Sequence, residues 1–159
     1  MTTDAVTENN SAAFNIQRVY LKGVSLEPAR IPAMFVEQGE LQMEFSLATT
    51  IGQLAPNIYE VVLRGTLTAK KGNVVDFLLE VDQSGIFEAL NIPQDQLGAV
   101  LEINGPTILA PYLRSNIADI LQRATLPAFV MPEINWVAAF TEKQKALQAQ
   151  QAAAPALVH

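Results

Sequence analysis

"NIYEVVLRGTLTA" at residues 57–69 and "VVDFLLEVDQ" at residues 74–83 carry the pattern that decides the fold. In both runs apolar side chains recur at every second position, which is the period of a strand with one buried face. The intervening "KKGN" at residues 70–73 has the composition of a hairpin turn. The two runs therefore predict an antiparallel hairpin, whose inward face comprises Tyr59, Val61, Leu63, Leu67, Val75, Phe77, Leu79 and Val81.

Two earlier segments also alternate and predict two more strands. "LQMEFSLA" at residues 41–48 is one of them, and "FNIQRVYLKGVSLE" at residues 14–27 is the other. The latter carries Val19 and Leu21 on its second face, which predicts cover on both sides. A loop at residues 28–40 joins the two strands, and connections of this length tend to be functional. In strict alternation one face of the first strand comprises Phe14, Ile16, Tyr20, Val24 and Leu26.

Beyond Phe87 the period changes to that of helices. "QDQLGAVLEI" predicts a short helix at residues 94–103, and a separate long helix is expected to begin near Pro111. An extended, proline-broken segment follows at residues 125–135, and a last helix is expected from about Trp136 to Gln151. Strands followed by helices predict an α+β fold, a four-stranded antiparallel sheet with helices packed on one face.

The chain is expected to form one domain with disordered ends. We assign residues 13–148 to the domain, residues 1–12 to a disordered N-terminal segment and residues 149–159 to a disordered tail of low complexity. The stretch "NGPTILAPYLRSNIADILQRATLPAF" at residues 104–129 is apolar over roughly half a helix circumference. Two interpretations stay open: packing against the sheet or a second subunit, and the lining of a groove open to an apolar partner.

Composition disfavours several classes of function. The chain has no cysteine, and its one histidine is the final residue, so a histidine-based catalytic triad or metal cluster is not expected. A net charge of −6 argues against nucleic-acid binding. No apolar run approaches the ~18 residues of a membrane span, and the first residues lack the pattern of a secretory signal. We expect a cytoplasmic protein that is not an enzyme and takes no cofactor or metal.

Carboxylates gather on the outward face of the second hairpin strand. Asp76, Glu80 and Asp82 alternate there with Leu78 between them. A solvated sheet face is the ordinary interpretation, and a metal or acid–base site is disfavoured because no supporting partner is visible. An apolar side chain ringed by acids also suits a docking surface for a basic partner, with fast and salt-sensitive association.

Two irregular segments are rich in Phe, Met and Pro. They are "IPAMF" at residues 31–35 and "LPAFVMP" at residues 126–132. Surfaces that contain Met can repack around many apolar partners. The alternative, that both are loops tucked over the core, stays equally open.

Five motifs together resemble the SecB family of protein-export chaperones over about residues 14–140. They are "FNIQRVYLKGVSLE", "YEVVLRGTLTA", "FLLEVDQSGIF", "ILAPYLRSNIADI" and "LPAF", in the order and spacing of that family. The resemblance implies a homotetramer, a dimer of dimers, that holds unfolded preproteins in a translocation-competent state without ATP. It also implies delivery of these clients to the motor SecA.

The resemblance implies two sets of contact residues. Leu78, Glu80 and Glu27 match the positions that contact SecA, with Asp76 and Asp82 expected to support them, while Gly23 stands where an acidic residue is usual. The helix motif differs at Ala110 and Leu113. Unfolded clients are expected to contact Ile31, Met34, Phe35, Ile86, Phe87, Leu113, Ile117, Phe129 and Met131. The alternatives are a carrier of small apolar ligands and a SecB-like chaperone dedicated to a toxin–antitoxin system.

Overall fold

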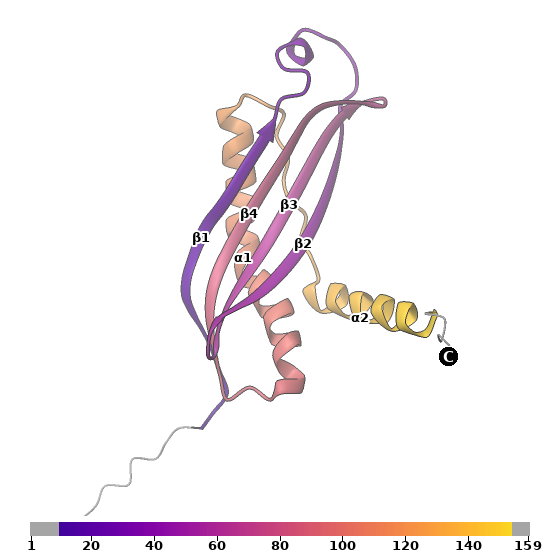
Figure 1. The fold of residues 1–159 in the computed structure, drawn as a ribbon. Coiled ribbons are helices and arrows are strands. Elements are labelled where there is room, and N and C mark those ends of the chain that lie inside the picture. The colour runs from indigo at the N-terminus through magenta and orange to yellow at the C-terminus, as the bar shows by residue number, and fades with distance from the viewer. Residues whose placement is uncertain (1–9, 154–159) are drawn as a thin grey trace, which may run out of the picture.

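A computed structural model describes residues 10–153 and contains one antiparallel sheet of four strands. The strands are β1 (Ala13–Glu27), β2 (Gln42–Ala55), β3 (Ile58–Lys71) and β4 (Val74–Leu90), in the order β1-β4-β3-β2. Because β1 and β2 lie at opposite edges, the chain between them must cross the whole sheet. We call residues 28–41 the crossover loop; it contains one short 3-10 helix, η1 (Ala33–Phe35). The predicted α+β sheet is confirmed (Figure 1).

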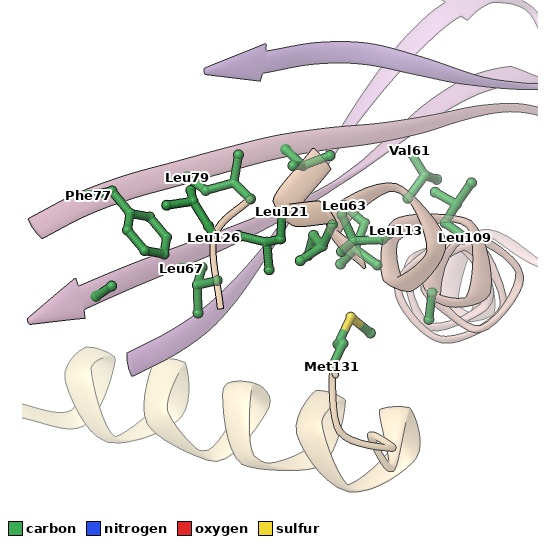
Figure 2. Packing of buried hydrophobic residues seen from close by; sticks show 14 of the residues in the cluster. Val61, Leu63, Leu67, Phe77, Leu79, Leu109, Leu113, Leu121, Leu126 and Met131 are labelled. Atoms are coloured by element: carbon green, nitrogen blue, oxygen red, sulfur yellow. The ribbon is translucent and has the colours of Figure 1, made fainter. Parts of the chain in front are cut away.

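The central hairpin forms as predicted. Leu67 of β3 lies opposite Leu79 of β4, and the turn between the strands uses Gly72 at a φ of 61°, a conformation that glycine adopts without a steric penalty. Six of the eight side chains predicted to face inward are buried, and Tyr59 is partly buried against them. The prediction is wrong for Val75, which pairs with the outward-facing Lys70 beyond a bulge. Figure 2 shows the labelled leucines of helix α1 (Gln94–Arg123) meeting those of β3 and β4. The buried six are Val61, Leu63, Leu67, Phe77, Leu79 and Val81.

Strand β1 does not keep a strict alternation. Bulges between Ile16 and Arg18 and between Leu21 and Gly23 each add one residue relative to β4. Since one extra residue moves the following side chains to the other face, the expectation that Tyr20 shares the face of Phe14 is wrong. Tyr20 instead donates a hydrogen bond to Glu60 on the outer face of the sheet.

The two helices expected between residues 94 and 124 are one helix, α1 (Gln94–Arg123), with Pro106 and Pro111 inside it. Each proline removes one backbone hydrogen bond, which is why the sequence suggested a break. Tertiary packing overrides this cost, because one continuous row of residues four apart is buried on the sheet. The row comprises Leu101, Gly105, Leu109, Leu113, Ile117 and Leu121.

Helix α2 (Trp136–Ala153) follows an extended linker, as expected, but projects away from the sheet instead of packing on it (Figure 1). None of its residues is buried. Residues 149–153 are helical, so the expectation of a disordered tail from residue 149 is wrong for that part. Residues 10–12 form neither helix nor strand. The remainder of both expected disordered ends, residues 1–9 and 154–159, lies outside the described residues.

Candidate functional site

A groove of about 890 Å³ lies between the edge strand β2, the linker from α1 to α2 and the first turns of α2. β2 is open here because it has only one neighbouring strand. The linker is extended because prolines interrupt it, and it crosses this edge before α2 begins. We call this surface the β2 groove; its lining residues are Phe45, Leu47, Ala48, Thr49, Glu102, Phe129, Val130, Pro132, Ile134, Trp136, Ala139, Phe140 and Lys143.

The β2 groove is aromatic and carries little uncompensated charge. The rings of Phe45 and Phe129 lie 5.1 Å apart in a tilted arrangement, and Val130 is 74% exposed. The two charged lining residues neutralise one another, because Lys143 Nζ donates to Glu102 Oε2 at 3.0 Å. Such a surface suits apolar side chains of an extended chain.

Most of the predicted client contacts lie elsewhere than expected. Phe129 lines the β2 groove, and Phe35 is 48% exposed on η1. Ile31 is partly buried against the core. The expectation that the remaining core residues line an open groove is wrong, because each is at most 6% exposed and packs between sheet and helix: Met34, Phe87, Leu113, Ile117 and Met131.

Ile86 is also misassigned. It alternates with the buried Phe87 along β4, so it points to the opposite, outer face of the sheet. Ile86 pairs with Arg18 of β1 and Glu60 of β3, which also belong to that outer face. A single groove cannot contain both Ile86 and Phe87.

Sequence reasoning missed the principal lining residues of the β2 groove. Phe45 and Leu47 have the alternation of an ordinary strand, and alternation does not tell which strand lies at an edge. The sequence did contain a signal for two other lining residues, Trp136 and Phe140. They are spaced i, i+4, so they share one face of a helix.

Three of the residues expected to form an acidic docking surface come together on the outer face of the sheet. Glu27 of β1 lies directly opposite Leu78 of β4. Two residues away on each strand, Ser25 lies opposite Glu80, so Glu27, Leu78 and Glu80 are neighbours on one face. Neither Glu27 nor Glu80 forms an ion pair within residues 10–153, whereas Leu78 is half-buried between them. We call Glu27, Leu78 and Glu80 the acidic patch.

The neighbouring carboxylates are compensated by basic side chains. Arg64 donates to both carboxylate oxygens of Asp82, from Nε at 2.7 Å and from Nη2 at 2.8 Å. This fork lowers the pKa of Asp82 below its usual range and raises the pKa of Arg64. Hydrogen bonds from Lys22 and then Tyr20 lower the pKa of Glu60 in the same way. Among the carboxylates next to Leu78, Glu27 and Glu80 are therefore the two that form no ion pair within the described residues.

Asp76 does not belong to the acidic patch. Its side chain is fully buried, and it accepts a hydrogen bond from Arg30 Nη1 at 3.1 Å. The cause is a bulge: Ala69 pairs with Phe77 and Lys70 with Val75, which leaves Asp76 without a partner in β3. The expectation that Asp76 shares the exposed face of Glu80 is wrong.

A family model described as preprotein translocase subunit SecB matches residues 7–147. The chain belongs to the SecB family. This confirms the resemblance of the motifs and places the protein among protein-export chaperones rather than enzymes.

Individual relatives agree with the family model. The protein-export protein SecB of Burkholderia multivorans is 48% identical to this SecB-family chain over 145 residues, which cover 91% of each chain. The protein of the same name from Burkholderia cenocepacia is 47% identical over 147 residues, covering 92% of this chain and 90% of the relative. Among solved structures, a SecB-like chaperone of Mycobacterium tuberculosis in complex with a peptide from an antitoxin has a TM-score of 0.62 at 15% identity. It covers 77% of this chain and 91% of its own, and it supports the SecB-like fold.

None of the helices within residues 10–153 has the length and apolar character of a membrane span. The same residues contain no group of three or more acidic or histidine side chains placed to hold a metal ion.

Proposed function

We propose that this SecB-family chain is an ATP-independent holdase of the cytoplasm, which binds unfolded preproteins in the β2 groove and delivers them to SecA. The observation that carries the proposal is the β2 groove itself, with aromatic side chains from strand, linker and helix and with its one pair of charges neutralised. Folded proteins present few apolar segments long enough to enter it. Selection for the unfolded state follows from that difference.

Binding at one groove is expected to be weak and adaptable. Each apolar side chain that leaves water gains about 25 cal/mol per Å² of buried surface, which gives roughly 2 kcal/mol for one phenylalanine. A long client that occupies several grooves gains avidity through effective concentration. The exposed Phe35 of the crossover loop and the partly buried Ile31 are proposed as additional client contacts.

Several grooves require several subunits, and we propose a homotetramer built as a dimer of dimers. Strand β1 has a free edge and exposes Ile16, Leu21 and Val24, at 53%, 46% and 46%. All three lie opposite inward-facing residues of β4, on the side that α1 covers only in part, and Leu21 does so because the first bulge turns it to this face. A second copy of the chain that pairs along β1 would cover this apolar strip.

SecA is proposed to dock on the acidic patch, with Asp82 as a supporting contact. The patch lies on the outer face of the sheet, whereas the inward-facing residues of β2 line the client groove. The two partners therefore need not compete for one surface, and a client can be transferred from a chaperone that SecA already holds.

Suppression of aggregation tests the client groove. Phe140→Ala removes a lining side chain from α2 and is expected to weaken the binding that suppresses aggregation of a denatured client by roughly 30-fold, because about 2 kcal/mol of apolar burial is lost. Leu147→Ala is the matched control, since Leu147 is 43% exposed on the same helix but does not line the groove. Equal activity of the two variants would contradict the proposed site.

A further inference from the structure

The crossover loop is fastened to the β3-β4 hairpin by an ion cluster around the buried carboxylate of Asp76. The backbone N–H of Arg30 donates to the carbonyl of Asp76 at 3.0 Å, and Arg30 Nη1 donates to Asp76 Oδ1 at 3.1 Å. Arg30 also donates to Glu37, which lies further along the same loop. Asp76 is thus bound at two points by one loop residue while its own side chain is sealed from solvent.

A second residue of the hairpin holds the middle of the crossover loop. Lys71 Nζ donates to the carbonyls of Met34 at 3.2 Å and Glu37 at 3.4 Å. It also lies 3.8 Å from Asp76 Oδ2, an oxygen that accepts no hydrogen bond from the described residues. Figure 1 shows the loop and the β3-β4 turn at the same end of the sheet. We call Asp76, Arg30 and Lys71 the loop clamp.

The clamped segment presents apolar side chains to solvent. Met34 is buried beneath η1, whereas the next two residues, Phe35 and Val36, are 48% and 84% exposed. Because Phe35 and Val36 are exposed, they do not hold the crossover loop in place. The anchoring comes from Met34 and the loop clamp, which leaves Phe35 and Val36 available to a partner.

We propose that Asp76 is a positioning residue for client binding, which acts through Arg30 and Lys71 to keep the crossover loop ordered with Phe35 and Val36 presented to an unfolded chain. This inference rests on the proposed holdase function. A loop that is ordered before binding loses less conformational entropy when the client arrives, and affinity increases accordingly. A buried carboxylate is well suited to the role, because breaking its pair leaves an uncompensated charge in the protein interior.

The variants Arg30→Gln and Lys71→Met test the loop clamp without altering the buried carboxylate itself. Lys70→Met is the matched control, since Lys70 is the adjacent lysine and pairs with the exposed Glu44 instead of the loop. Amide hydrogen exchange of residues 28–41 in the full-length, client-free protein measures loop order. Each test variant is expected to speed this exchange by roughly 10- to 100-fold, which corresponds to one charge-assisted hydrogen bond, while Lys70→Met leaves it unchanged.

Affinity for a permanently unfolded probe, reduced and carboxymethylated α-lactalbumin, measures the consequence. The test variants are expected to bind it several-fold more weakly than Lys70→Met at an equal content of folded protein, as judged by circular dichroism. Unchanged loop exchange would overturn the clamp, and faster exchange with unchanged affinity would overturn its role in client binding. A wild-type protein that does not bind the probe would instead overturn the proposed holdase function, on which the positioning role depends.

Discussion

At the scale of single residues, some charged side chains on the outer face of the sheet form ion pairs and others do not. Arg64 neutralises Asp82 and Lys22 neutralises Glu60, so these four groups add little net field. Glu27 and Glu80, which flank Leu78, form no ion pair within the described residues. Gly23 lies opposite Asp82 and adds no charge to the neighbourhood of the patch. The acidic patch therefore depends on few residues, and single substitutions should affect it strongly.

The variant Leu78→Arg is expected to weaken SecA binding by roughly 10-fold or more, because it places a positive charge between the two free carboxylates and removes the apolar contact. Suppression of client aggregation should be unchanged. Gln42→Lys serves as the control, since it adds a charge to the outer face on β2, at the opposite edge of the sheet. Binding to immobilised SecA at increasing salt measures the effect. Equal loss of both activities, or affinity independent of salt, would contradict the electrostatic docking.

Alternation in the sequence assigned Glu80 and Asp82 to the outer face correctly but failed at Asp76, only four residues away. The reason is that a bulge adds one unpaired residue and turns the side chain, and no residue type in "KKGNVVD" marks it. Arg30, the partner of the buried Asp76, lies 46 positions earlier in the chain. Pairing at such a separation becomes visible only when the sheet order is known.

At the scale of elements, the continuity of α1 depends on its close approach to β3. A Cβ added to Gly105 would lie 3.0 Å from both methyl carbons of Val61, so the helix lies as near to the strand as glycine permits. Gly105 also precedes Pro106, where a backbone hydrogen bond is missing. Close packing on β3 stabilises the helix at the position where its own hydrogen bonding is weakest.

The substitutions Gly105→Ala and Gly98→Ala should therefore have opposite effects in the same helix. Gly105→Ala is expected to lower the free energy of unfolding by about 1–3 kcal/mol through overpacking against Val61. A Cβ at Gly98 would have no atom within 4 Å, so Gly98→Ala should raise the free energy of unfolding by up to about 1 kcal/mol through helix propensity. Urea unfolding at one protein concentration measures both. Two changes of the same sign would show that α1 is not held against β3 as described.

The elements themselves were largely predictable, because the change from a period of two to a helical period is encoded locally. The long helix was wrongly divided because prolines weaken a helix locally, whereas the buried row from Leu101 to Leu121 that sustains it is a property of the whole packed layer. The β2 groove was missed for a related reason. Its walls come from a strand, a linker and a helix, and only the strand order leaves β2 open at the edge.

At the scale of the whole molecule, each edge of the sheet within residues 10–153 carries an apolar surface that the core does not cover. One is the β2 groove, proposed for clients, and the other is the strip of Ile16, Leu21 and Val24 along β1, proposed for assembly. The two surfaces lie at opposite edges of the sheet. Assembly along β1 would therefore leave the β2 groove of each subunit open.

Leu21→Glu is expected to shift the protein from the proposed tetramer to smaller species, because it places a charge in the apolar strip. Leu54→Glu is the control, since Leu54 is 56% exposed at the far edge on β2. Size-exclusion chromatography with light scattering gives the masses. A tetramer that survives Leu21→Glu, or one that is lost equally in Leu54→Glu, would contradict assembly through β1.

Photo-crosslinking of an unfolded preprotein tests the central claim most directly, that clients occupy the β2 groove. A photoreactive amino acid is placed in turn at Phe45, Trp136 and Phe140, and at Ile16 and Leu147 as positions outside the groove. We predict strong crosslinks from the three groove positions and weak ones from the other two. Crosslinks that are equally strong at all five positions, or strongest at Ile16, would contradict the account.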